Sequence, residues 1–126
     1  MKIIAIDFDG TIVHNRFPQI GPPMLGAIDT IKQLMNISYV KLILWTVRDN
    51  DHLTGAIEWL ESKGVVFDCV NKNINALSSS PKVYAHYYID DRACCAPTWR
   101  DGRAIYLDWD KIREDIEEKF VIKFNQ

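Results

Sequence analysis

Residues 2–11 read KIIAIDFDGT. The first part, residues 2–7, is short and almost wholly apolar, which is typical of a strand buried inside a parallel sheet. The run ends in Asp7, Asp9 follows two residues later, and Gly10 then permits a sharp turn of the backbone. We therefore expect two carboxylates at the carboxyl end of a buried strand.

Apolar strand patterns and amphipathic helix patterns alternate along the rest of the chain. Further strands are predicted at 40–45, 65–70, 84–89 and 104–107. Helices are predicted from Pro22-Pro23 onward, over 51–63, near 73–79 and over 109–119, and residues 121–124 suit either an edge strand or a continued last helix. This alternation predicts a single α/β domain over residues 1–126, with a three-layer Rossmann-like fold and a central parallel sheet of about five strands.

The composition is ordinary for a globular protein, with 48% hydrophobic and 25% charged residues and a net charge of −2. This balance gives little electrostatic support for binding nucleic acid or an anionic membrane. The three cysteines have no CxxC spacing, so reduced thiols are expected. The apolar run before Asp7 is too short for a signal peptide, and no run approaches the ~20 residues of a membrane span. A cytoplasmic location is therefore expected.

Polar residues follow the ends of four predicted strands. They are Asp7 and Asp9, then Thr46 and Arg48, then Lys72, and finally Asp90 and Asp91. Ligands of parallel α/β sheets bind beyond the carboxyl ends of the strands, so these side chains are expected to meet. Clustered carboxylates repel one another unless a hard divalent cation binds them, and Mg²⁺ is the usual choice where phosphate also binds.

The ordered set resembles the haloacid dehalogenase-like (HAD) superfamily, in particular its small phosphatases. The resemblance rests on DxDGT at 7–11, Thr46, Lys72 and the pair Asp90-Asp91, and it covers nearly the whole chain. It implies a phosphatase in which Asp7 attacks phosphorus to form an aspartyl-phosphate and Asp9 transfers protons.

The same resemblance implies the remaining roles at the site. Thr46 and Lys72 would hold the phosphoryl group. Mg²⁺ would be bound by Asp7, Asp90 and the backbone carbonyl of Asp9, with Asp91 in the inner or the outer coordination sphere. Arg48 is left open, either as a substrate contact or as a salt-bridge partner of Asp49 or Asp51.

The phosphate-binding lysine has a second candidate, Lys82. It precedes strand 84–89, whose six residues at ~3.3 Å each would place it about 20 Å from the active edge, so we favour Lys72.

No gap between the motifs is long enough for a cap domain, so an open site is predicted. Either a large substrate or a partner subunit in a homo-oligomer would then exclude water, and segments 12–21 and 92–103 would wall the site.

Three alternatives to this assignment remain. One is another reaction of the same superfamily, such as phosphoryl transfer. A second is a non-catalytic binding or regulatory module, whose usual mark is the loss of one of the paired aspartates, yet Asp7 and Asp9 are both present. A third is a nucleic-acid end-processing phosphatase, which suits an open site but not the charge balance. The sequence does not identify the phosphorylated substrate.

Overall fold

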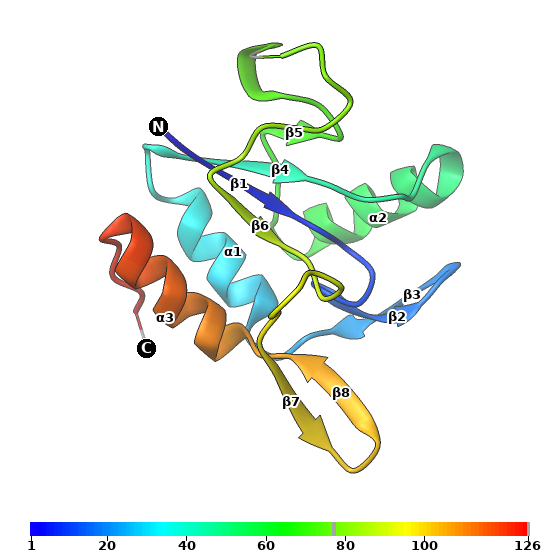
Figure 1. Ribbon diagram of the computed structural model, residues 1–126. Coiled ribbons are helices and arrows are strands. Elements are labelled where there is room, and N and C mark those ends of the chain that lie inside the picture. The colour runs from blue at the N-terminus through cyan, green and yellow to red at the C-terminus, as the bar shows by residue number, and fades with distance from the viewer. Residues whose placement is uncertain (77, 126) are drawn as a thin grey trace.

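The computed structural model describes residues 1–76 and 78–125 and has a parallel sheet at its centre (Figure 1). Its strands are β1 (Lys2–Ile6), β4 (Val40–Leu44), β5 (Cys69–Val70) and β6 (Tyr87–Ile89), in the spatial order β5-β4-β1-β6. Ile6 of β1 pairs with Leu44 on one side and with Ile89 on the other. The carboxyl ends of the central strands therefore lie side by side.

All three helices contribute to the core on one face of this sheet. They are α1 (Ala27–Met35), α2 (Asn50–Ser62) and α3 (Trp109–Phe120). Their buried side chains join Ile4, Ile6, Leu42 and Leu44 in one apolar cluster. Ile4 and Ile6 lie two positions apart in β1 and therefore face the same side of the sheet, because side chains alternate between the two faces of a strand.

The opposite face of the sheet has a thinner cover. Ile3, Ala5 and Ile43 pack there against Ile74 and Val83, from the segment between β5 and β6. This segment contains only a short 3₁₀ turn, η1 (Ile74–Ala76), where a helix near 73–79 was predicted; residue 77 lies outside the described residues. A second helical layer, as the three-layer prediction requires, is therefore not seen among the described residues.

Two antiparallel hairpins extend beside the sheet, on the side toward which the ends of β1 and β6 point (Figure 1). The first consists of β2 (Val13–Arg16) and β3 (Gln19–Pro23), and the second of β7 (Thr98–Asp101) and β8 (Ala104–Leu107). The segments 12–21 and 92–103, predicted as loops, thus contain ordered strands.

The prediction that residues 104–107 form a fifth strand of the central sheet is wrong. This strand forms, but it pairs with β7 across a two-residue turn in which Gly102 has φ +62°. Asp-Gly is a strong hairpin signal, because such turns need positive φ. The described central sheet accordingly has four strands.

Several element boundaries also differ from the prediction. Pro22 and Pro23 end β3 instead of opening a helix, since proline and the residue before it favour extended backbone; α1 begins only after Gly26. Residues 121–124 form neither strand nor helix, because Val121 ends α3 with φ +54° and Ile122 and Phe124 fold back onto the core.

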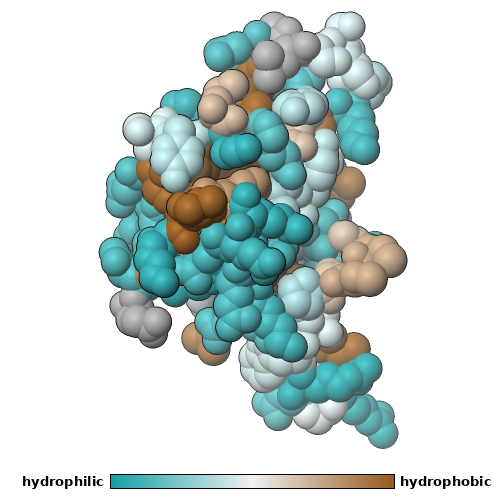
Figure 2. Space-filling model, turned by 60° about the vertical axis from the view of Figure 1, so that its left-hand side comes forward, coloured by the Kyte–Doolittle hydropathy of each residue, from teal (hydrophilic) through white to brown (hydrophobic). Residues whose placement is uncertain are grey.

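One face of the molecule is mainly hydrophilic, with apolar side chains gathered in a limited area (Figure 2). Within residues 1–76 and 78–125, no helix combines the length and the apolar character that crossing a membrane requires. The cytoplasmic location stays a prediction.

Candidate active site

The ends of β1, β4 and β6 open into one cleft of about 330 Å³. The backbone N–H of Asp7 donates to the carbonyl of Ile89 at 2.9 Å, which aligns the ends of β1 and β6. Ten residues line the cleft: Asp7, Asp9, Asn15, Phe17, Val47, Arg48, Asp49, Asp90, Asp91 and Arg92. The predicted meeting of the strand-end residues is thus confirmed for both aspartate pairs and for Arg48.

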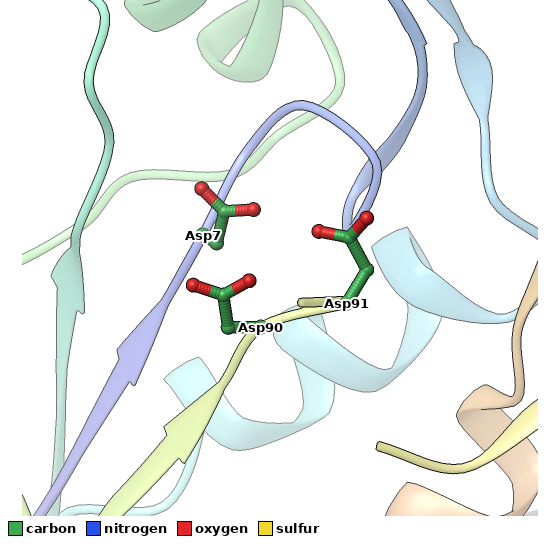
Figure 3. A group of neighbouring side chains, drawn as sticks. All are labelled: Asp7, Asp90 and Asp91. Atoms are coloured by element: carbon green, nitrogen blue, oxygen red, sulfur yellow. The ribbon is translucent and has the colours of Figure 1, made fainter. Parts of the chain in front are cut away.

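Three carboxylates form an acidic cluster in this cleft, and Figure 3 shows them facing one another. They belong to Asp7, Asp90 and Asp91, and one oxygen from each lies within 4.8 Å of the others. Asp7 comes from the end of β1, whereas the other two follow β6. The side chain of Asp9 is not part of this cluster.

The Thr11 side chain is fully buried and joins two members of the acidic cluster. Its hydroxyl lies 3.0 Å from Asp7 Oδ2 and 3.2 Å from Asp91 Oδ1, and it accepts from the backbone N–H of Asp91 at 3.0 Å. The indole N–H of Trp109, at the start of α3, donates to the Thr11 carbonyl at 2.9 Å. The loop after β1 is therefore fixed both to the loop after β6 and to α3.

The acidic cluster is electrostatically unfavourable on its own. Burial, followed by the charge of Asp90, raises the pKa of Asp7 to about 7, although the hydrogen bond from Thr11 opposes this shift. Burial also raises the pKa of Asp91. These shifts have the direction expected when carboxylates share a partly desolvated site without a neutralising partner.

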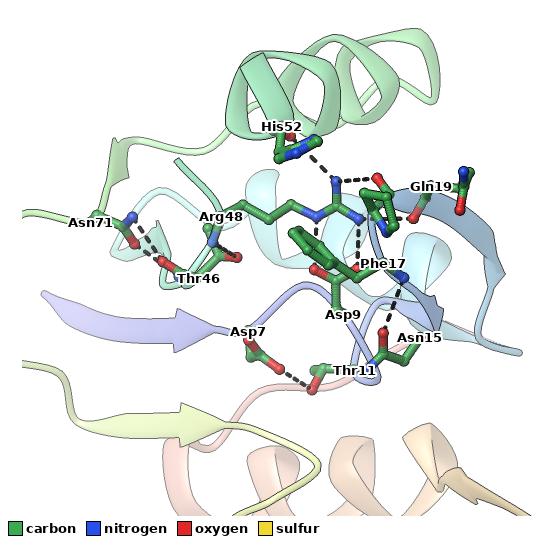
Figure 4. A network of polar contacts seen from close by, with 11 residues as sticks. Asp7, Asp9, Thr11, Asn15, Phe17, Gln19, Thr46, Arg48, His52 and Asn71 are labelled. Atoms are coloured by element: carbon green, nitrogen blue, oxygen red, sulfur yellow. Dashed lines mark hydrogen bonds and ion pairs between the residues drawn. The ribbon is translucent and has the colours of Figure 1, made fainter. Parts of the chain in front are cut away.

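Asp9 has a different environment, although it lies only two residues from Asp7 (Figure 4). Arg48 Nε donates to its Oδ2 at 2.7 Å and Arg48 Nη2 donates to its Oδ1 at 2.8 Å. The arginine is 2% exposed. Arg48 therefore forms a buried two-point salt bridge, and neither Asp49 nor Asp51 is its partner.

Thr46 follows β4 and is held by Asn71, which follows β5. Asn71 Oδ1 accepts from the Thr46 N–H at 2.8 Å and its Nδ2 donates to the Thr46 carbonyl at 2.9 Å. The Thr46 hydroxyl accepts from the Arg48 N–H at 3.1 Å, which leaves the hydroxyl proton available for another acceptor. Thr46 lies next to the lining residue Val47 but does not itself line the cleft.

Neither lysine candidate is part of the cleft lining within the described chain. Lys72 is exposed after β5, the outermost strand on its side of the sheet. Lys82 lies over the ring of Tyr88, 5.5 Å from its centroid. The other cationic residue of the cleft, Arg92, is exposed at the rim. Its backbone N–H donates to Asp90 Oδ1 at 2.9 Å.

Both segments predicted as walls contribute to the site. The tip of the β2–β3 hairpin supplies Phe17, and the segment after β6 supplies Arg92. A neighbouring cavity of about 390 Å³ lies between the two hairpins, and its lining includes His14 and Arg16. It shares Asn15 and Asp91 with the cleft, so the two spaces adjoin at the acidic cluster.

Two residues that organise the site were not predicted. In the sequence Thr11 is only part of the motif, and a hydroxyl directly after Asp-x-Asp-Gly is the feature that could have indicated a donor to the neighbouring carboxylates. Asn71 stands beside Lys72, and asparagine readily adopts the positive φ of +53° found there. That conformation lets its amide reach the backbone of the adjacent strand end.

The acidic cluster fits a hard divalent cation. It offers three carboxylate groups whose oxygens converge. Burial and the charge of Asp90 raise the pKa of Asp7, so a bound cation would relieve an unfavourable buried charge. Oxygen-only donors suit Mg²⁺, Mn²⁺ or Ca²⁺ and do not distinguish among them. Asp7, Asp90 and Asp91 would hold the ion. The backbone carbonyl of Asp9 as a further ligand stays a prediction, and the Asp9 side chain is held by Arg48.

Comparison with known proteins gives one informative likeness. A solved structure described as a conserved protein of Bacteroides thetaiotaomicron is 38% identical, with a TM-score of 0.77 over 98% of each chain. The chain belongs to the family of that conserved protein. The description of this relative states no activity, so family membership leaves the chemistry open. No protein-family model matches the chain, and neither does any curated protein.

Proposed function

We propose that the protein is a divalent-cation-dependent phosphomonoesterase, with Asp7 as the nucleophile and Mg²⁺ as the expected ion. One observation carries the proposal: the carboxylates of Asp7, Asp90 and Asp91 converge in a cleft that also contains Asp9. An acidic cation site beside a second, separately held carboxylate suits phosphoryl transfer, which needs charge neutralisation and proton transfer at different places. The resemblance to HAD phosphatases agrees with this assignment.

The proposed reaction has two steps that use this chain's residues. A carboxylate oxygen of Asp7 forms a bond to phosphorus as the ester P–O bond breaks, and Asp9 gives a proton to the departing alcohol oxygen. Water then attacks phosphorus while Asp9 takes up one of its protons, which releases phosphate and restores Asp7. A bound cation would neutralise the phosphate oxygens and lower the repulsion between them and the acidic cluster.

The phosphoryl group needs further hydrogen-bond donors. The Thr46 hydroxyl retains a free proton at the end of β4, and Arg92 brings positive charge to the rim of the cleft. Lys72, predicted for this role, stays a candidate, because lysine has a long and flexible side chain and is exposed after β5. Comparing KM in Lys72→Ala, Lys82→Ala and Arg92→Ala would identify the main contact.

A second candidate function is a module that binds a cation or a phosphate without turnover. One observation favours it: both oxygens of Asp9 accept hydrogen bonds from Arg48. An aspartate that stays fully committed to this pair would not exchange protons with a substrate. The two functions make opposite predictions for hydrolysis and the same prediction for cation binding.

The deciding experiment measures phosphate release from nucleotides, sugar phosphates, DNA 3′-phosphates and p-nitrophenyl phosphate, with Mg²⁺ and with chelator. Calorimetry measures Mg²⁺ binding to the same preparations, with Asp90→Asn as the variant expected to weaken binding. Cation-dependent hydrolysis supports the phosphomonoesterase, and binding without hydrolysis supports the module. Absence of both would reject the phosphomonoesterase and a cation-binding module.

A further inference from the structure

Arg48 uses every hydrogen-bond donor of its guanidinium inside the protein. Nε and Nη2 bind the two oxygens of Asp9, and Nη2 also donates to the Gln19 carbonyl at 2.9 Å. Nη1 donates to the carbonyls of Pro18 at 3.2 Å and His52 at 3.4 Å. Because arginine has five N–H donors, none remains for a substrate. The prediction that Arg48 contacts substrate is therefore not supported by this geometry.

Aromatic rings enclose the same guanidinium. Its central carbon lies 5.2 Å from the ring centroid of Phe8 and 5.0 Å from that of Phe17. Phe8 lies between the two aspartates of the motif, whereas Phe17, Pro18 and Gln19 lie at the tip of the β2–β3 hairpin. Arg48 thus joins the strand-end loop after β4, the loop after β1 and the hairpin tip at one point (Figure 4).

The geometry points to Arg48 as a positioning residue, which orients the Asp9 carboxylate and fixes the β2–β3 hairpin over the cleft. As far as Asp9 acts on a leaving group, this inference rests on the proposed phosphomonoesterase function. The attachment of the hairpin to Asp9 through Arg48 does not depend on it. Two experiments therefore test the two parts separately.

The two-point contact orients Asp9 without occupying it fully. A carboxylate has about four lone-pair sites, and the guanidinium takes one on each oxygen. The Asp9 side chain is 12% exposed, so part of it faces the cleft while the Arg48 side chain is 1% exposed. Lysine at position 48 would keep the positive charge but lose the planar fork that defines the carboxylate plane.

The first experiment compares Arg48→Lys with wild type on two kinds of ester. An alkyl phosphate such as glycerol phosphate needs a proton on its leaving oxygen, whereas p-nitrophenyl phosphate has a leaving group that departs without one. We expect kcat/KM, which reports the step in which the leaving group departs, to fall by about 30-fold or more for the alkyl ester and by less than about 3-fold for the aryl ester. The second step is common to both esters, so kcat does not separate them. KM should not rise, because Arg48 has no donor left for substrate.

Arg113→Lys is the matched control for this change. Arg113 also donates to an aspartate, Asp29, and to the Thr30 hydroxyl at 2.6 Å, but it does so between α1 and α3, away from the cleft. This control should leave the alkyl-to-aryl ratio of kcat/KM unchanged. Equal losses of kcat/KM on both esters, a raised KM without a change in kcat, or a faster alkyl reaction in Arg48→Lys would overturn the positioning role.

The second experiment needs no turnover and also covers the case that Arg48→Lys is poorly folded. Amide hydrogen exchange is followed in the β2–β3 hairpin for wild type, Arg48→Lys, Asp9→Asn and Arg113→Lys. We expect hairpin amides to exchange about 10-fold faster or more in the first two variants, but not in Arg113→Lys, because only they cut the attachment. Unchanged exchange in both cleft variants would overturn the attachment. Faster exchange in a protein without phosphatase activity would uphold it while the proposed function fails.

Discussion

Asp7 and Asp9 lie two residues apart after the same strand, yet they have opposite electrostatic environments. Asp7 lies among two further carboxylates, and its pKa is raised to about 7. Asp9 has a buried arginine that binds both of its oxygens. The fold thus supplies the second carboxylate with a cationic partner of its own, whereas the first lies beside Asp90 and Asp91, where the proposed cation would bind.

The largest expected effect is a loss of catalysis. The variants of Asp7 and Asp9 should differ in whether they affect both alkyl and aryl phosphates or mainly the alkyl ester. Asp7→Asn should lower kcat by about 10³-fold or more on alkyl and aryl phosphates alike, since the nucleophile is lost. Asp9→Asn should lower kcat/KM mainly for the alkyl ester, since only this ester needs a proton on its leaving oxygen. Initial rates over a range of substrate concentrations measure both effects, and Asp51→Asn, exposed on α2 outside the cleft, should behave as wild type. An active Asp7→Asn enzyme would contradict the assignment of the nucleophile.

The next largest effect is a loss of stability, which we expect on substitution of Asp9 but not of its control, Asp49. Asp9→Asn leaves the buried Arg48 charge without its counter-ion, so the free energy of unfolding should fall by about 3 kcal/mol. Urea denaturation at pH 8 in the presence of chelator measures it. Asp49→Asn serves as the control, because this exposed aspartate precedes α2 without a side-chain capping hydrogen bond and does not pair with Arg48. A loss at Asp9 no greater than that of the control would mean that the salt bridge contributes little.

Gly10 should prove sensitive because of its closeness to the acidic cluster. A Cβ added there would lie 2.5 Å from Asp91 Oδ2, whereas nothing lies within 4 Å of a Cβ at Gly102. Both glycines have positive φ, so each alanine variant should lose about 1 kcal/mol from backbone strain alone. We expect Gly10→Ala to lose about 2 kcal/mol in total and to bind Mg²⁺ more weakly. Thermal unfolding and calorimetry test this, and equal losses for the two variants would argue against crowding of Asp91.

The smallest effect is a gain in stability at Asp7. A raised pKa in the folded state means that the protonated form stabilises the fold, fully below pH 4 and not at all once the pH exceeds about 7. Without cation, wild type should therefore lose stability between pH 4 and pH 7. The change in pKa from 3.8 to about 7 sets an upper bound of about 4 kcal/mol on this effect, which solvent in the open cleft reduces. Asp7→Asn, which stays neutral, should therefore be more stable than wild type by about 1 kcal/mol at pH 8 and equal to it at pH 4. A variant that is less stable at pH 8 would contradict the repulsion within the acidic cluster.

The sequence predicted the central strands and the meeting of their ends, because apolar runs followed by acidic residues have one simple arrangement in a parallel sheet. It did not predict the partner of Arg48. Asp49 and Asp51 are its neighbours along the chain, but Asp9 lies beside it in the fold, because the paired strands β1 and β4 end side by side. Strand 104–107 was likewise recognised but given the wrong partner, since an apolar pattern defines a strand and not its pairing. The Asp101-Gly102 pair before it is the hairpin signal that could have indicated its true partner, β7.

Because β6 is short, a cation bound at the acidic cluster would add a cross-link to a strand that few residue pairs hold in place. Three residue pairs join β6 to β1, and Asp90 follows directly where this ladder ends. A cation held by Asp7 together with Asp90 and Asp91 would continue the ladder as an inorganic cross-link between segments far apart in the chain. Its stabilising effect would rise with the ratio of cation concentration to dissociation constant, unlike that of a covalent bridge. The resistance of this sheet edge to unfolding would then follow the availability of the ion.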